Sequence, residues 1–309
     1  MHNRYCELFG TSTSNGVDSF VKSIVVSGTD LYVGGNFTSA SDSTGTKECN
    51  YIAKWNTLTN TWSTLSASSI IQQGAGGNQF ISASDKASDD YFGNSVAINS
   101  TGDRIVVGAY GSNPGGTSDA GKVYVCVSSS GTGWTQQGST GNTYISASDK
   151  GVGDNFGYSV AINSAGDRIV VGAYRADPGG TSNAGKVYIY VSSSGTGWVE
   201  QGSGGNTYIS ASDKASNDNF GYSVAINSAG DRIVVGAYRA NPGGTSDAGK
   251  VYVYVSSSGT GWVEQGSGGN PFISASDKAL SDNFGNSVAI NNTGDRIVVG
   301  AYRANPGGT

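Results

Sequence analysis

The sequence is poor in the side chains from which most catalytic and metal sites are built. Histidine occurs once in 309 residues, as His2, so a Ser-His-Asp triad, a zinc site with several histidines or a facial iron triad cannot be assembled. Cysteine occurs three times, in neither a CxxC pair nor an even-numbered framework. We therefore expect no enzymatic activity, no metal site and no cofactor.

Charge and long apolar segments are also scarce. Charged residues make up 13% of the chain, against about 25% in ordinary globular proteins. Lys and Arg number 18, Asp and Glu 23, and no basic run is present that could neutralise phosphates or anionic lipids. The longest apolar runs, such as residues 169–174, are far shorter than the roughly 20 residues that cross a bilayer as a helix. We expect no nucleic-acid partner and no membrane span.

The main feature that the sequence does contain is a tandem repeat. The segment Ile-Ser-Ala-Ser-Asp-Lys begins at Ile81, Ile145, Ile209 and Ile273, so the repeat is 64 residues long each time. Residues 145–208 and 209–272 differ at only eight of their 64 positions, with no insertion. Copies this similar must adopt the same structure.

Each repeat is predicted to form four short antiparallel strands and no helix. Glycine, at 49 residues, and serine interrupt every stretch with helical spacing. Turn-forming residues separate alternating or continuously apolar segments, which is typical of strands. Sheets that are apolar on both faces need a neighbour on each side, which favours an all-β, β-propeller fold with four-stranded blades. In the second repeat the expected strands are 156–162, 168–174, 187–191 and a fourth that begins at 198–201 and reaches 209–211.

The domain organisation follows from the repeat. Residues 17–66 carry a diverged copy of the same plan, and residues 67–309 hold the 64-residue units, of which the last is incomplete. About four and a half blades are therefore expected in one propeller domain. Residues 1–16 could supply a closing strand for a five-bladed ring, or the chain could be part of a larger propeller with seven blades.

Three motifs of the repeat unit resemble the FG-GAP repeat of integrin α chains and of many bacterial and algal surface proteins. They are Asp154-Asn-Phe-Gly-Tyr-Ser-Val-Ala, Val171-Gly-Ala-Tyr and Gly185-Lys-Val-Tyr-Ile-Tyr, and the resemblance covers residues 67–309. Trp134-Thr-Gln-Gln followed by Ala147-Ser-Asp is similar to the bacterial-type variant. Residues 31–37 and 52–56 resemble a kelch-type blade instead. The resemblance implies an extracellular or cell-surface propeller used for binding or adhesion.

The calcium loop of integrin-type FG-GAP blades is missing from these units. That loop reads Asp-x-Asp-x-Asp-Gly-x-x-Asp, because Ca²⁺ requires six to eight oxygen ligands. Residues 163–167, Asn-Ser-Ala-Gly-Asp, offer one carboxylate in a tight turn. We expect no calcium there. Asp149 with Asp154 could form a looser site, although capping of turns is the commoner role of such residues.

The candidate binding residues lie in loops that repeat the pattern Arg-Ala-Asp/Asn-Pro-Gly-Gly. Their side chains would be displayed on one rim and suit multivalent contact with a glycan or protein, unless Pro-Gly-Gly only forms a solvated turn. By contrast, the tyrosines of the third strand and Cys126 are expected to pack in the core. The candidate rim residues are Arg175, Asp177, Arg239, Asn241, Arg303 and Asn305.

Two covalent features complete the set of candidate sites. Sequons begin at Asn36, Asn99 and Asn291, although turn chemistry alone explains asparagine at the last two positions. Cys6 and Cys49 are the one pair of cysteines that could form a disulfide.

Composition, repeats and resemblance together predict a non-enzymatic, extracellular or cell-surface propeller with a structural or adhesive function. Its partners would be a protein or glycan at a cell surface, or other copies of the chain that complete the open blade. One alternative is a fragment of a longer seven-bladed surface receptor or adhesin. A carbohydrate-active enzyme is disfavoured, because the expected inner strands carry no carboxylate.

Overall fold

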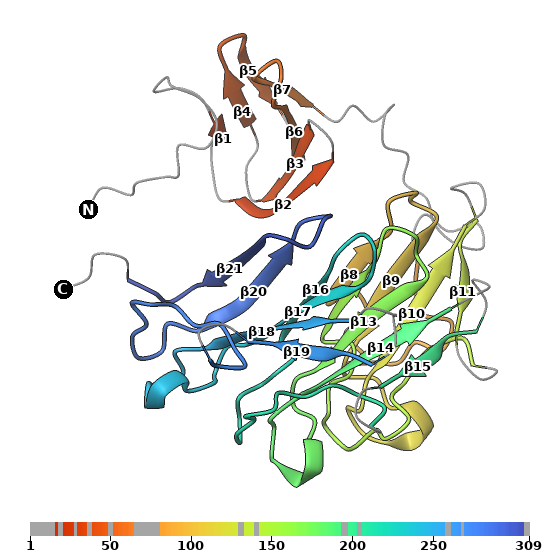
Figure 1. Ribbon diagram of the computed structural model, residues 1–309. Coiled ribbons are helices and arrows are strands. Elements are labelled where there is room, and N and C mark those ends of the chain that lie inside the picture. The colour runs from red at the N-terminus through yellow and green to blue at the C-terminus, as the bar shows by residue number, and fades with distance from the viewer. Residues whose placement is uncertain are drawn as a thin grey trace. The chain divides into compact units, whose positions relative to one another are not determined.

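The computed structural model describes most of the chain as strands and turns. The described residues are 16–17, 21–27, 30–35, 39–48, 52–64, 81–128, 133–138, 142–192, 197–202, 206–256, 261–266 and 269–305. The chain divides into two compact units, Met1–Gln72 and Gln73–Thr309. The only helical segments in the described part are three short 3-10 turns (Figure 1). The all-β prediction is confirmed.

The first unit contains a four-stranded antiparallel sheet. Its strands lie in chain order at the positions expected for the diverged N-terminal blade. A second sheet has three short strands and was not predicted, because its polar segments lack an alternating apolar pattern. The first sheet consists of β2 (Val21–Ser27), β3 (Asp30–Gly35), β6 (Ile52–Asn56) and β7 (Thr61–Thr64), and the second of β1 (Gly16–Val17), β4 (Ser39–Asp42) and β5 (Gly45–Glu48).

A buried carboxylate joins the two sheets of this unit. Trp55 and Trp62 pair across β6 and β7, with their rings edge-on at 5.1 Å. Asp42 accepts hydrogen bonds from the hydroxyl and backbone N–H of Thr44, from the backbone N–H of Trp62 and from Lys47 Nζ. Burial alone would raise the pKa of Asp42, but these hydrogen bonds outweigh it and lower the pKa from 3.8 to about 2.

The second unit is an array of three complete blades and a two-stranded sheet. The strands of each blade pair antiparallel in chain order, and a 3-10 turn follows the second strand of each complete blade. The first blade has β8 (Ser95–Ile98), β9 (Arg104–Ala109), η1 (Pro114–Gly116), β10 (Lys122–Val127) and β11 (Thr135–Gln137). The second has β12 (Ser159–Ile162), β13 (Arg168–Ala173), η2 (Pro178–Gly180), β14 (Lys186–Val191) and β15 (Val199–Gln201). The third has β16 (Ser223–Ile226), β17 (Arg232–Ala237), η3 (Pro242–Gly244), β18 (Lys250–Val255) and β19 (Val263–Gln265), and the last sheet has β20 (Phe284–Ile290) and β21 (Ile297–Ala301).

The first strand of the second blade is shorter than the sequence predicts. It begins at Ser159 instead of Phe156, because Asn155 and Gly157 have φ angles of 58° and 88° and place a turn before it. The N–H of Tyr158 closes this turn on the carbonyl of Asn155 at 3.1 Å. The fourth strand ends at Gln201, and Ile209 forms only an isolated bridge to Val187.

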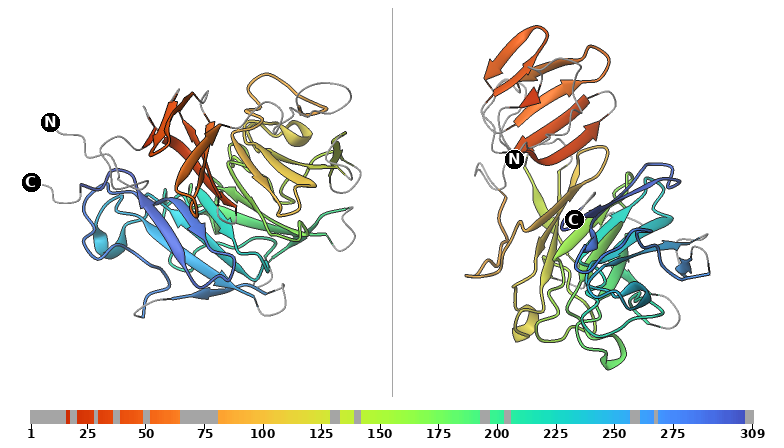
Figure 2. Two further views of the ribbon diagram at one scale, coloured as in Figure 1. Left: turned by 90° about the horizontal axis from the view of Figure 1, so that it is seen from above. Right: turned by 90° about the vertical axis from the view of Figure 1, so that its left-hand side faces the viewer.

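The first strands of successive blades lie next to one another. Strand β8 contacts β12, β12 contacts β16 and β16 contacts β20, and in Figure 2 the sheets of this unit follow one another from gold to blue. At the first two junctions a valine of the second strand belongs to the core cluster of the next blade, Val106 with Phe156 and Val170 with Phe220. The structure is thus that of an open, unclosed β-propeller array.

Candidate functional site

The rim loops are braced by their own polar side chains. Figure 1 shows the three 3-10 turns along one margin of the array. Asp177 Oδ1 accepts the N–H of Asn183 at 2.7 Å, and in the next repeat Asn241 Oδ1 accepts the N–H of Asp247 at 2.7 Å. These two candidate residues therefore close their own loops, as Asp and Asn commonly do in turns.

The three rim arginines are exposed but differ in their contacts. Arg175 and Arg303 each lie over the ring of the preceding tyrosine, at 5.4 and 5.3 Å from its centroid. Arg239 instead makes an ion pair with Asp247, Nε to Oδ1 at 3.3 Å. Asn305 is exposed. The loops thus present guanidinium groups beside aromatic rings, which is a surface suited to a polar partner.

A continuous row of tyrosines crosses the blade junctions, and we did not predict it. Neighbouring rings along the row have centroid distances between 4.2 and 5.4 Å. From Tyr110 onward, alternate members are the tyrosine after Gly-Ala in one blade and the tyrosine after Phe-Gly in the next, whereas Tyr91 precedes Phe-Gly in the first blade. The regular Gly-Ala-Tyr at 64-residue spacing is the sequence signal that could have revealed it. The row consists of Tyr91, Tyr110, Tyr158, Tyr174, Tyr222 and Tyr238.

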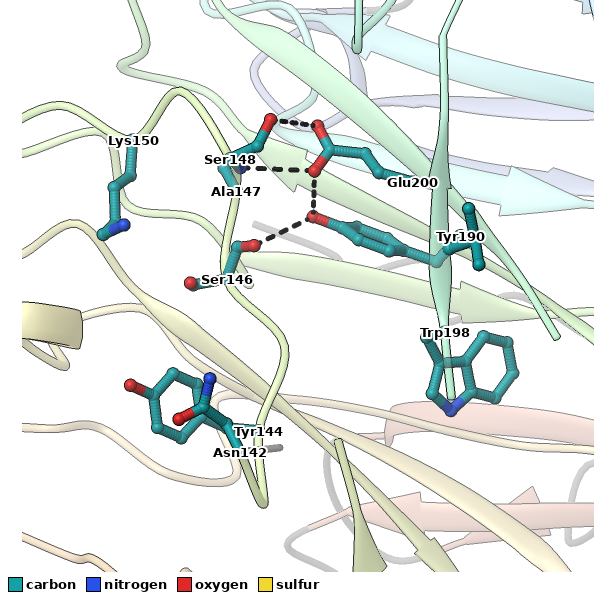
Figure 3. Close-up of a pocket in the computed structure, with 10 residues that line it drawn as sticks. Asn142, Tyr144, Ser146, Ala147, Ser148, Lys150, Tyr190, Trp198 and Glu200 are labelled. Carbon is teal, nitrogen blue, oxygen red and sulfur yellow. Dashed lines mark hydrogen bonds between the residues drawn. The ribbon is translucent and has the colours of Figure 1, made fainter. Parts of the chain in front are cut away.

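A surface pocket of about 400 Å³ lies beside the second blade (Figure 3). At one end Glu200 on β15 accepts hydrogen bonds from the N–H and hydroxyl of Ser148 at 3.2 and 3.1 Å. The hydroxyl of Tyr190 lies 3.1 Å from the same carboxylate and 3.2 Å from the carbonyl oxygen of Ser146. Burial raises the pKa of Glu200. Its hydrogen bonds, of which the one from Thr207 has the largest effect, favour the charged carboxylate and act in the opposite direction.

The first blade shows that this bonded group is a structural brace. There Cys126 and Gln136 stand where the second blade has Tyr190 and Glu200. Gln136 Nε2 donates to the carbonyl of Ser82 at 2.6 Å, and its Oε1 accepts the N–H of Ser84 at 3.1 Å. A neutral amide thus makes the same link between the fourth strand and the Ile-Ser-Ala-Ser segment. Because the link survives loss of the carboxylate, it does not indicate acid–base chemistry.

The acidic residues considered for a looser metal site have other partners. Asp149 accepts hydrogen bonds from Lys186 Nζ at 2.8 Å and from the Tyr188 hydroxyl at 2.7 Å. Asp154 accepts the N–H of Gly151 at 2.6 Å and so caps a turn. Within the described residues, no group of three or more His, Cys, Asp or Glu is placed to hold a metal ion.

The remaining candidates fall into two groups. Asn36, Cys6 and Cys49 lie outside the described residues. Asn99 is buried, and its Nδ2 donates to Thr101 Oγ1 and Asp103 Oδ1 at 2.8 and 2.7 Å. Asn291 makes the same two contacts in an exposed turn, to Thr293 Oγ1 and Asp295 Oδ1 at 2.8 and 2.6 Å. Turn chemistry therefore accounts for both described asparagines, and the exposed Asn291 is the more accessible sequon.

The packing expectations for the third strand are confirmed. Tyr188, Tyr190, Tyr252 and Tyr254 are buried, and Trp198 lies in the core at the junction of two blades. Cys126 is fully buried, and burial raises the pKa of its thiol to about 11. These side chains are core residues and not a ligand-stacking surface.

Comparison with protein families agrees with the geometry. The FG-GAP repeat matches residues 78–126, 134–190, 206–254 and 272–309, which is more than half of the chain. The chain belongs to the FG-GAP repeat family. FG-GAP propellers are generally non-enzymatic, commonly mediate protein contacts and are typical of extracellular or surface proteins. The kelch-like character of the first unit stays a prediction, because the matches begin at residue 78.

No curated protein matches the chain. Among the described residues, no helix has the length and apolar character needed to cross a bilayer.

Proposed function

We propose that this FG-GAP chain is a non-enzymatic structural or adhesive module of the extracellular space or cell surface. Its proposed activity is head-to-tail assembly with other copies of itself. The family supports a binding role in general terms, and the two end faces of the blade array support assembly in particular.

The observation that carries this proposal is the exposure of one repeated valine. Val106, Val170 and Val234 occupy the same repeat position and are 0% exposed. Val106 and Val170 belong to the core clusters of the following blades, and β17, which carries Val234, contacts β20 of the last sheet. Val298 occupies that position on β21 and is 72% exposed. The last sheet therefore presents the apolar surface that forms a blade junction elsewhere in the chain.

The opposite end of the array presents the complementary surface. Val96 and Ile98 on β8 are 65% and 59% exposed, whereas Val160, the equivalent of Val96 in the second blade, is 9% exposed. Within the second unit, the outer faces of β8 and β21 are apolar, and each matches a surface that is buried against the other type at the junctions between blades. A second copy can thus reproduce a junction by placing its β8 face on the β21 face of the first.

The test uses one charged substitution on each face. Light scattering over a concentration series should show oligomers of the unaltered chain, and both Val298→Lys and Val96→Lys should abolish them. The matched control is Val199→Lys, since Val199 is 61% exposed on the outer strand β15 and lies on neither face. This variant should assemble normally.

A mixture of the two face variants distinguishes head-to-tail assembly from other modes. V298K keeps an intact β8 face and V96K an intact β21 face, so equal amounts should form one-to-one dimers and nothing larger. A monomeric unaltered chain at all concentrations, or oligomers that survive both substitutions, would overturn the proposal.

The rim loops support a second candidate function, which is adhesion to a polar protein or glycan. Arg175 and Arg303 repeat one arrangement over a tyrosine ring, whereas Arg239 is held by Asp247. We expect the double variant Arg175→Ala/Arg303→Ala to bind more weakly than the unaltered chain to the cell-surface glycans of a glycan array. The variant Arg239→Ala should lose less binding. Equal binding by all variants would exclude the rim arginines as the adhesive site.

A further inference from the structure

Two tyrosines from neighbouring blades lie with their hydroxyl groups together. The hydroxyl of Tyr158 donates to the hydroxyl of Tyr222 at 3.0 Å, and the ring centroids are 4.9 Å apart with an interplanar angle of 42°. Both rings are only partly buried. The Cε atoms are the ring carbons next to the carbon that carries the hydroxyl, so the hydrogen bond brings together the ends of the two rings that carry them.

This arrangement depends on where tyrosine occurs among the repeats. The position after Phe-Gly is tyrosine in the second and third repeats, and it is Asn94 in the first and Asn286 in the last. Asn94 Nδ2 donates to the backbone carbonyl of Tyr158 at 3.1 Å. Within the described part of the chain, Tyr158 and Tyr222 are the one pair of tyrosine hydroxyls joined by a hydrogen bond.

We propose that Tyr158 and Tyr222 are a preformed pair for oxidative coupling into a dityrosine, which would join the second and third blades covalently. The carbon atoms that must bond are those next to the hydroxyl on each ring, and the hydrogen bond already holds these ends of the rings together. The oxidant is hydrogen peroxide. An enzyme of the haem peroxidase class uses it to remove one electron at a time from tyrosine.

The chemistry balances as follows. Each phenol loses one electron and one proton and becomes a phenoxyl radical. The two unpaired electrons form a carbon–carbon bond between one Cε of each ring, and the hydrogen on each of these carbons then moves to the phenol oxygen. The two electrons and two protons removed reduce one hydrogen peroxide to two waters.

The tyrosine row gives an oxidant access to this pair. Tyr91 is 54% exposed and stacks on Tyr110 at 4.8 Å with parallel rings. Tyr110 lies 5.3 Å from Tyr158, which completes a chain of adjacent rings from the surface to the pair. A radical formed at Tyr91 can therefore reach Tyr158 by transfer between neighbouring rings.

The test treats the purified full chain with peroxidase and hydrogen peroxide at a low protein concentration. We expect dityrosine fluorescence, a monomer on denaturing gels, and a mass lower by two hydrogens. Peptide mass spectrometry should find the peptides with Tyr158 and Tyr222 joined. These readouts concern a link within one chain, so they do not depend on whether copies assemble.

Substitution by phenylalanine identifies the pair and keeps the packing of the rings. Tyr158→Phe and Tyr222→Phe should each abolish the intramolecular product, at least tenfold by fluorescence. Tyr188→Phe is the matched control, because Tyr188 is buried and bonds Asp149, and it should leave the yield unchanged. The proposal is overturned if the joined peptides contain a different pair, if only chain-to-chain links form, or if either variant still forms the product.

Discussion

The close approach of neighbouring blades should make Gly172 intolerant of any side chain. A Cβ on Gly172 would lie 2.0 Å from the carbonyl oxygen of Gly221 and 2.3 Å from Ser159 Oγ. Ordinary contacts of this kind begin at 3.4 Å, so Gly172→Ala must push the backbone of the next blade away by more than an ångström. The carbonyl of Gly221 also accepts the hydroxyl of Ser159 at 2.8 Å, and this hydrogen bond would be lost or displaced.

The magnitude follows from these two effects. Overpacking of a tight interior costs about 1–3 kcal/mol, and loss of a hydrogen bond at a partly buried site costs about 1 kcal/mol. We therefore expect Gly172→Ala to lower the free energy of unfolding by about 3 kcal/mol. For a folded unit of this size that corresponds to a fall of about 6–12 °C in Tm.

The last repeat supplies a matched control for this substitution. Gly300 occupies the same repeat position, but a Cβ there meets Ser287 Oγ at 2.3 Å and no atom of a following blade. A serine hydroxyl can rotate away, so Gly300→Ala should cost less than about 1 kcal/mol. Urea denaturation followed by circular dichroism measures both variants. Equal stability of the two variants would refute the idea that backbone contact between blades limits this position.

Two further predictions concern buried ionisable groups. The thiolate is the reactive form of cysteine, and burial raises the pKa of Cys126 to about 11. Iodoacetamide should therefore alkylate this residue only slowly in the folded chain at pH 8, as measured by peptide mass spectrometry. Rapid labelling without denaturant would contradict its burial. The folded pKa of Asp42 is lowered to about 2, so its contribution to stability is present above pH 3.8 and lost as the pH falls toward 2. The indole NMR signal of Trp62 should report unfolding in that range, and an Asp42→Asn variant should show a weaker pH dependence there; an equal dependence would argue against this carboxylate as the cause.

The repeat made the fold of the second unit predictable, whereas the contacts between side chains that are distant in the sequence could not be predicted. Strands such as β13 and β14 lie where apolar segments and turn residues placed them. The ion pair of Asp149 with Lys186 escaped prediction because the two residues are 37 positions apart and meet only when the third strand returns past the preceding loop. The contact of Tyr158 with Tyr222 escaped for a similar reason, since it needs two blades side by side.

The candidate site was predictable to a smaller extent. The sequence correctly located the loops that hold Asp177 and Asn241, but the same residue types bind ligands and cap turns, and only the 2.7 Å contacts to the loop backbone show the second role. The sequence could not predict that Val298 is exposed, because the same residue type at the same repeat position, Val234, is buried. Burial at these positions depends on the presence of the following blade.

The central claim is that the open ends of the blade array bind each other. The most direct test is the mass of the unaltered chain in solution by light scattering across a concentration series, with negative-stain images of the same samples. The account predicts a mass that rises with concentration above the 31.4 kDa of one chain, in particles that extend along one direction. A constant mass of 31.4 kDa with compact particles at every concentration would contradict it.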